Sequence, residues 1–450
     1  MKEFNKSLKE IDTTIYDLLN KEEKRQQEKL LLNAAISFTP KSILEIQGSK
    51  FDNIDAEGYI PDYISNQSLE ELDDIDKQIS LYNKYKDDRF NKCCEYANIV
   101  EALAQKRLAQ VFENENAKEI YVNVQVPTGA LANYIVYKAL LKPNDTILSL
   151  GVNDGGHTTH GDLEHESSEE YNIINYHISM EKNDIDYDEI EKLLIEYKPQ
   201  LLIAGASAFP LNIDWLRIRK LIDEYSNKTI FLSDIAHTAG LVAGKVFNNP
   251  IGISDVTTLV TYKTFCGPRA GAIITTNKDI KKKIDETVFP KIMGSPLLLG
   301  ISALAVSAKL ALSDEYKKLQ QNIVKNSRIL CNELIKLNIP VVYGKTDTHI
   351  VLIDCEKYGN KEKIANILED CDILVNGCMV PSISGYHDGI RLGTTCITQY
   401  NISEENVKKI AGIIASILNE IKDSKEVNYK KYKLEVASIV KEVFNNDNLW

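Results

Sequence analysis

The amino-acid sequence predicts an α/β protein, with a mainly parallel sheet in a large domain and a smaller α/β domain after it. Between about residues 95 and 300, helical patterns alternate with short β-branched runs. That alternation is typical of a parallel sheet covered by helices on both faces. A second, shorter set of helical and strand-like patterns follows Pro296. The chain has 450 residues, of which 44% are hydrophobic, and this is enough for two or three domains.

The first 45 residues predict helix, because apolar side chains recur every three to four positions. They are Leu8, Ile11, Ile15, Leu18 and Leu19, followed by a second apolar segment over 30–36. Residues 60–88 are unusually acidic and polar and form a segment of their own. The predicted organisation is therefore a helical N-terminal arm over 1–59, an acidic segment over 60–88, a large domain over 89–300 and a small domain over 301–450.

Within the large domain the sequence predicts a helix over Tyr96–Phe112 and a series of short strands. The strands are expected at Ile120–Val124, Thr146–Leu150, Leu201–Ala204, Thr229–Leu232, Thr257–Thr261 and Gly271–Thr275. In the small domain we expect strands at Val341–Tyr343 and Ile350–Asp354. An isoleucine-rich stripe from Ile402 to Ile421 predicts a helix that packs on a core, with Ser403 as its N-cap.

Two residues at predicted strand ends indicate a cofactor site. Asp234 ends the run Ile-Phe-Leu-Ser-Asp, and Lys263 follows the run Thr-Thr-Leu-Val-Thr-Tyr. Ligands of parallel sheets bind beyond the carboxyl ends of the strands. A lysine amine that condenses with an aldehyde, and a carboxylate that keeps a pyridine nitrogen protonated, are the groups that pyridoxal 5'-phosphate requires. The alternative interpretation of such a lysine is a solvated residue at a strand edge.

The composition argues against several other classes of function. A formal net charge of −12 disfavours a nucleic-acid or anionic-membrane partner, since both select basic surfaces. No apolar run approaches the roughly 20 residues that span a bilayer, and the first residues lack the core of a signal peptide, so we expect a cytoplasmic protein. The eight cysteines form neither a zinc pattern nor a disulfide framework, so no metal site is predicted.

Seven motifs then follow one another along the chain. They are Val-Asn-Val-Gln (122–125), Thr-Gly-Ala-Leu-Ala-Asn (128–133), Gly-Gly-His-Thr-Thr-His-Gly (155–161), Ala-Gly-Ala-Ser-Ala-Phe-Pro (204–210), Asp-Ile-Ala-His-Thr-Ala-Gly-Leu-Val-Ala (234–243), Tyr-Lys-Thr-Phe-Cys-Gly-Pro-Arg-Ala-Gly (262–271) and Gly-Ile-Arg-Leu-Gly-Thr (389–394). From Val122 to Thr398 their order and spacing resemble the serine hydroxymethyltransferase family, pyridoxal phosphate enzymes of the aspartate aminotransferase fold, fold type I. The resemblance implies a seven-stranded type of sheet in the large domain.

The resemblance also implies a role for each candidate residue. Lys263 bonds covalently to the cofactor, Asp234 pairs with its pyridine nitrogen, and His157 stacks on its ring. Arg391 grips the substrate carboxylate, for which a planar, two-pronged donor suits better than a lysine. Glu57 handles protons at the hydroxymethyl group. The other matches to the cofactor pocket and its surroundings are Thr128, Gly129, Ala130, Ser207, His237, Arg269 and Gly294.

The implied reaction is reversible cleavage of the Cα–Cβ bond of serine, or of another β-hydroxy amino acid, to give glycine. Tetrahydrofolate is the one-carbon acceptor that the family uses. Each active site of the family's obligate dimer borrows residues from the neighbouring subunit, and here those segments surround Glu57 and Gly294. The resemblance therefore implies a homodimer with shared active sites, and it leaves a tetramer open.

The sequence is that of a divergent member, because it departs from the family pattern within the site. Ala130 replaces a serine that binds the cofactor phosphate, Asp55 replaces a tyrosine, and Tyr262 replaces a histidine. Two alternatives therefore stay open: a folate-independent aldolase or transaldolase in a specialised pathway, and a non-catalytic paralogue. The family has only a few residues where this chain has residues 60–88, so the resemblance implies an acidic insertion there. Further departures are Val152, Thr158, Val260, Ser295, Cys378 and residues 90–93, which follow the insertion.

Overall fold

The computed structural model describes residues 3–444, and its central element is a seven-stranded sheet. Six strands are parallel, and β10 is antiparallel to both of its neighbours. The α/β fold class is confirmed. In the order in which they lie, the strands are β2 (Tyr121–Asn123), β10 (Gly271–Thr275), β9 (Val256–Val260), β8 (Ile230–Asp234), β7 (Leu201–Ala204), β3 (Thr146–Leu150) and β4 (Asn172–Tyr176).

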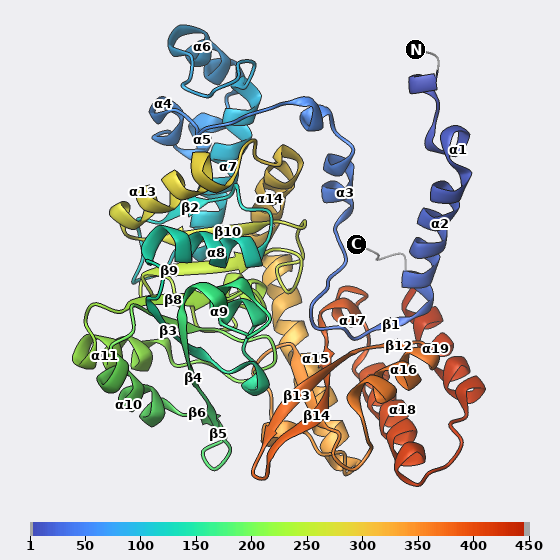
Figure 1. Ribbon diagram of the computed structural model, residues 1–450. Coiled ribbons are helices and arrows are strands. Elements are labelled where there is room, and N and C mark those ends of the chain that lie inside the picture. The colour runs from blue at the N-terminus through green and yellow to red at the C-terminus, as the bar shows by residue number, and fades with distance from the viewer. Residues whose placement is uncertain (1–2, 445–450) are drawn as a thin grey trace.

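Helices cover both faces of this sheet (Figure 1). Successive residues of β7 alternate between two apolar clusters: Leu201 and Ile203 belong to one, and Leu202 and Ala204 to the other. This alternation is the two-residue period of a strand buried on both faces. The helices that contribute are α7 (Glu95–Phe112), α8 (Gly129–Leu140), α9 (Glu166–Glu170), α10 (Tyr187–Tyr197), α11 (Trp215–Tyr225), α12 (Ala239–Ala243), α13 (Lys278–Glu286) and α14 (Leu298–Ala311).

The C-terminal part of the chain builds a second core around a three-stranded antiparallel sheet. The sheet has the order β11 (Ile350–Asp354), β14 (Gly385–Gly393) and β13 (Asn376–Ser382). Ser403 caps α18 as predicted, since its Oγ accepts a hydrogen bond of 3.2 Å from the Asn406 amide. The helices are α15 (Asp314–Lys336), α16 (Lys361–Asp370), α17 (Thr395–Gln399), α18 (Glu404–Lys422) and α19 (Tyr429–Phe444).

Two local predictions were wrong. Residues 30–36 are not helical: β1 (Leu30–Leu31) pairs in parallel with β12 (Ile373–Leu374), and the Leu30 amide donates to the Asp372 carbonyl at 2.9 Å. Tertiary pairing with a distant strand here overrides the local helical period. Val341–Tyr343 is not a strand either, because Tyr343 has a φ of +62° and lies in a short 3₁₀ turn, leaving one isolated bridge between Val341 and Ile353.

The N-terminal arm comprises α1 (Leu8–Ile11) and α2 (Thr13–Glu28), then β1, then α3 (Lys41–Gln47). In Figure 1, α2 lies beside α19 of the small domain. The predicted apolar stripe is not buried in the chain. The exposed fractions of its members are 42% for Leu8, 57% for Ile11, 45% for Ile15, 54% for Leu18 and 59% for Leu19.

The segment 60–88 folds into three short helices, α4 (Asp62–Ser65), α5 (Leu69–Leu72) and α6 (Ile75–Tyr85). All three pack against α7, at the top of Figure 1. A small apolar cluster joins them to that helix, with Ile64 and Leu72 from this segment and Ala102 from α7. Among the residues described, no helix is both long and apolar enough to cross a membrane.

Candidate active site

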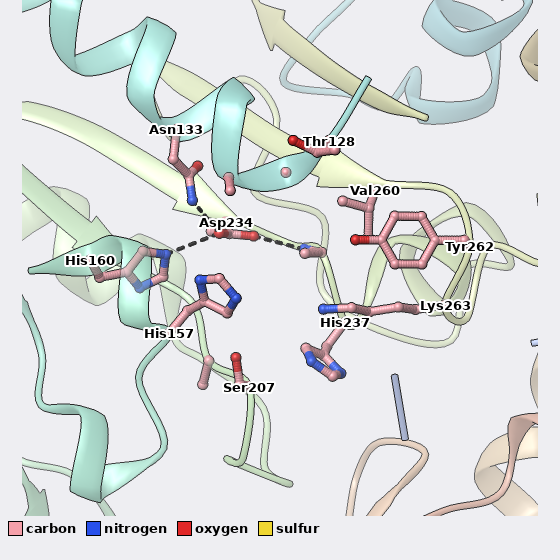
Figure 2. Close-up of a pocket in the computed structure, with 14 residues that line it drawn as sticks. Thr128, Asn133, His157, His160, Ser207, Asp234, His237, Val260, Tyr262 and Lys263 are labelled. Atoms are coloured by element: carbon pink, nitrogen blue, oxygen red, sulfur yellow. Dashed lines mark hydrogen bonds and ion pairs between the residues drawn. The ribbon is translucent and has the colours of Figure 1, made fainter. Parts of the chain in front are cut away.

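A pocket lies at the carboxyl ends of β7, β8 and β9 and at the start of α8 (Figure 2). It brings together residues that are up to 135 positions apart in the sequence, from Thr128 to Lys263. This is the edge at which parallel sheets bind ligands. Of the predicted site residues, the pocket contains Thr128, Gly129, Ala130, His157, Ser207, Asp234, His237 and Lys263.

Asp234 ends β8 and is almost completely buried, with 8% of its side chain exposed. Its Oδ2 accepts hydrogen bonds from Asn133 at 2.9 Å and from His160 Nε2 at 3.0 Å, and its Oδ1 accepts from the Ala236 amide at 2.9 Å. Burial raises the pKa of the carboxyl, but the contacts with His160 and Asn133 outweigh burial and hold the pKa well below its usual range. Asp234 is therefore ionised at neutral pH.

Lys263 follows β9 and is 7% exposed. Burial lowers the pKa of its amine to about 8, with Asp234 opposing the shift and Arg391 adding to it. A lysine becomes a nucleophile when its amine loses the proton, and burial is one way to make that possible near neutral pH. The alternative interpretation, a solvated lysine at a strand edge, does not fit this burial.

Two histidines of the pocket are kept neutral by their surroundings. Burial, followed by the proximity of His160, lowers the pKa of His157 to about 4. Burial, then the charges of Lys263 and Arg391, lowers the pKa of His237 well below its usual range. The His237 ring stacks on His349, with centroids 5.6 Å apart, and His349 Nε2 lies 3.1 Å from the carbonyl of Ala34 in the N-terminal arm.

The start of α8 forms one wall of the pocket. Thr128 is its N-cap, and the Thr128 hydroxyl accepts a hydrogen bond of 3.2 Å from the Leu131 amide. The N–H groups of a first helical turn have no acceptor within the helix, so this end is suited to an anion. A Cβ at Gly129 would lie 2.7 Å from Val260 Cγ1, so the close packing of helix and strand requires glycine there.

Arg391 reaches the large domain from β14 of the small domain. Its Nη1 donates to the Ser207 carbonyl at 2.6 Å and its Nη2 to Asn376 at 3.2 Å. Its Nε is buried and has no hydrogen-bond partner among the residues described. A buried guanidinium nitrogen without an acceptor is costly, so this group is suited to an incoming carboxylate.

The chain does not bring Glu57 and Gly294 into its own lysine pocket, whose lining contains neither. These two residues lie together instead: a Cβ at Gly294 would be 3.0 Å from Glu57 Oε1. The neighbouring Ala56 amide donates to Ser295 Oγ at 3.1 Å. Arg269 does not line the pocket but stacks on the ring of Tyr262, which does, with its guanidinium 4.7 Å from the ring centroid.

The sequence matches known proteins along nearly all of its length. The sequence model of the serine hydroxymethyltransferase family matches residues 8–81 and 63–414. The chain belongs to the serine hydroxymethyltransferase family. Proteins named serine hydroxymethyltransferase from three strains of Acinetobacter baumannii, ATCC 17978, AYE and ACICU, are each 35% identical to it over 438 residues, covering 96% of this chain and 97% of theirs.

Membership confirms the predicted family, the predicted fold type and the prediction of an enzyme. Members of the serine hydroxymethyltransferase family are pyridoxal phosphate-dependent transferases that act on small amino acids. The chain is thus a serine hydroxymethyltransferase-like enzyme, and the comparisons do not favour the alternatives of a folate-independent aldolase or a non-catalytic paralogue. The two stretches of the family match overlap at residues 63–81, inside the predicted insertion.

The pocket fits the cofactor of the serine hydroxymethyltransferase family. It combines an amine that loses its proton near pH 8, a carboxylate that stays ionised and a helix start that is free for an anion. These are the complements of an aldehyde, a protonated pyridine and a phosphate. The fit survives the replacement of serine by Ala130, because a helix start binds anions through backbone amides.

Sequence reasoning missed Asn133, His160 and His349. Asn133 and His160 stand inside recognised motifs, and each lies one helical turn or one short loop from a residue that was singled out. Their place inside those motifs was the signal that the sequence offered. His349 has no such signal, because it reaches His237 only through the packing of the small domain on the large one.

The close approach of Gly205 to Asp234 yields a test of the site's rigidity. Gly205 has a φ of +147°, and a Cβ there would lie 2.2 Å from the Asp234 carbonyl. We expect Gly205→Ala to lower the free energy of unfolding by about 2 kcal/mol or more, through strain and overpacking. The matched control is Gly412→Ala in α18, where nothing lies within 4 Å, and it should raise stability by about 0.5–1 kcal/mol. Urea unfolding measures both, and equal effects would contradict the close approach.

Proposed function

We propose that this enzyme transfers the hydroxymethyl carbon of serine to tetrahydrofolate. The Cα–Cβ bond of serine breaks, the bonding electrons stay on Cα, and a proton adds there to give glycine. The released carbon, at the oxidation level of formaldehyde, joins two nitrogens of tetrahydrofolate with loss of water. The observation that carries the proposal is the pairing of a buried, ionised Asp234 with a buried lysine of lowered pKa in one pocket.

Each residue of the pocket has a task in this proposal. When bound, pyridoxal phosphate supplies an electron-accepting ring. Lys263 would hold its aldehyde carbon and Asp234 its pyridine nitrogen, while the start of α8 at Gly129 and Ala130 would hold its phosphate. His157 and His237 line the same pocket as neutral rings, so they add no positive charge that would compete for Asp234.

Arg391 would bind the carboxylate of the amino acid through its unpartnered Nε. Its contact with the Ser207 carbonyl already fixes the guanidinium plane, so little side-chain freedom is lost on binding. Because Arg391 comes from the small domain and Lys263 from the large one, the substrate would lie where the two domains meet.

We further propose a homodimer in which Glu57 and Gly294 of one subunit complete the pocket of the other. Support comes from their position: they adjoin each other and not the lysine pocket of their own chain. The exposed apolar stripe of the N-terminal arm provides a surface for such an assembly. In its partner's site Glu57 would exchange protons with the serine hydroxyl, a task for which a carboxyl group is suited.

The first test is the reaction itself. The purified enzyme with pyridoxal phosphate should form glycine from serine, and tetrahydrofolate should accelerate this strongly, as measured by chromatography of the amino acids. Lys263→Ala should abolish turnover, a loss of about 10⁴-fold or more, since it removes the covalent anchor of the cofactor. Equal rates with and without tetrahydrofolate would contradict the proposed acceptor and favour an aldolase.

The second test is the pH dependence of cofactor attachment. Only the neutral amine of Lys263 reacts with an aldehyde, so the neutral fraction grows as pH rises toward the pKa of about 8. The rate at which apoprotein binds pyridoxal phosphate, followed by absorbance, should rise up to about pH 8 and then level off. A rate that keeps rising to pH 10 would show an ordinary, solvated lysine.

The third test is complementation between two inactive variants. Glu57→Gln and Lys263→Ala should each be inactive as homodimers. A mixed dimer has one pocket with both native residues, so refolding an equal mixture should restore about one quarter of the native activity, because half of the dimers are mixed and each has one good site of two. No recovery would place Glu57 and Lys263 in the same subunit's site.

A further inference from the structure

The backbone around Glu57 is held by the residues that follow the insertion. Ala56 and Gly58 both present their carbonyl oxygens to Arg89 Nη1, and the Gly58 contact is 3.1 Å long. Between them, the Glu57 carbonyl accepts a hydrogen bond of 3.1 Å from the Phe90 amide. The carbonyl groups of three consecutive residues, 56–58, are thus held by two consecutive residues, Arg89 and Phe90. These two residues directly follow the segment 60–88.

Arg89 is itself anchored to α7. Its side chain is fully buried and forms an ion pair of 2.6 Å with Glu101, which is also fully buried. Its Nε donates to Asn98 at 2.6 Å. Glu101 accepts a second hydrogen bond, 2.9 Å long, from Gln125, and the same Gln125 amide donates to the Gly58 carbonyl at 2.9 Å. A buried charge with this many partners has one geometry, so the Glu57 loop is tied to a rigid helix.

The insertion does not cover the lysine pocket. None of the residues from 60 to 88 lines it, and α4, α5 and α6 pack on α7 instead. The two ends of the insertion meet, because a Cβ at Gly58 would lie 3.3 Å from Arg89 Cα and Gly58 has a φ of +107°. The insertion is therefore a loop that packs on α7, and its two ends, at Gly58 and Arg89, lie in contact.

We propose that Arg89 is a positioning residue that holds the Glu57 carboxylate in register with the partner subunit's pocket. The inference rests on the role proposed for Glu57. A group that transfers protons must lie within hydrogen-bond reach of its target, and a displacement of about 1 Å costs about 100-fold in rate. Arg89 fixes the peptide on either side of Glu57 without touching the pocket, so it acts on rate and not on binding of serine.

The test replaces the ion pair without leaving a buried charge unpaired, since one charge alone would destabilise the fold. The double variant Arg89→Met/Glu101→Gln removes both charges. With the dimeric holoenzyme we expect kcat for serine and tetrahydrofolate to fall about 10- to 100-fold, while KM for serine and the absorbance of bound cofactor stay unchanged. Hydrogen exchange at residues 56–59 should become faster. The matched control is Arg219→Met, which removes a partly buried ion pair with Asp255 on the surface of α11, and it should change neither kcat nor loop exchange.

A second variant covers the case in which the double variant does not fold. Arg89→Lys keeps a positive charge beside Glu101 but cannot also hold Asn98 and the two carbonyls, so kcat should fall while KM for serine stays unchanged. Glu57→Gln is measured beside both. If Glu57→Gln loses activity but the Arg89 variants keep native kcat and native exchange at residues 56–59, the positioning role is wrong and the proposed function stands. If Glu57→Gln is fully active, the role proposed for Glu57 is wrong, and the positioning role of Arg89 is wrong as well.

Discussion

The buried carboxylate of Asp234 is the constraint around which the rest of the site is organised. A charge at a buried strand end must be compensated by hydrogen bonds, and three different elements supply them. Asn133 comes from α8, His160 from the turn after β3, and the Ala236 amide from the turn after β8. Asn133 also accepts a hydrogen bond of 2.7 Å from Thr258 of β9. Satisfying one carboxylate therefore fixes the relative positions of most of the pocket's walls.

Hydrogen bonding and burial give the ionisable groups of the pocket different charges. Asp234 stays ionised, while burial lowers the pKa of Lys263 to about 8 and makes the rings of His157 and His237 neutral at the same pH. The pocket thus contains a fixed negative charge on Asp234 and an amine, that of Lys263, that can lose its proton. Positive charge enters from the small domain through Arg391, on the side where an amino acid would bind. The sheet and the small domain therefore contribute different chemistry to one site.

Much of this arrangement could be predicted from sequence, because a strand end and its polar residue are local features. Asp234 and Lys263 follow β-branched runs, and parallel strands bring their carboxyl ends to one edge. The partners of Asp234 could not be found in this way, since nothing local distinguishes Asn133 from any polar residue in a helix. The same limit explains β1: the pairing of Leu30 with Ile373 depends on a contact across more than 300 residues, and its local pattern is helical.

Three of the departures from the family pattern line this pocket. Ala130, Val260 and Tyr262 lie near the start of α8, whereas Asp234 keeps its hydrogen bonds from Asn133 and His160. This distribution follows from energetics. A neutral hydroxyl contributes about 0.5–1.5 kcal/mol through one hydrogen bond, and backbone amides at a helix start remain when it is lost. Leaving a buried carboxylate without its partners costs about 3–5 kcal/mol. Changes at the start of α8 therefore cost less than a change that removes a partner of Asp234.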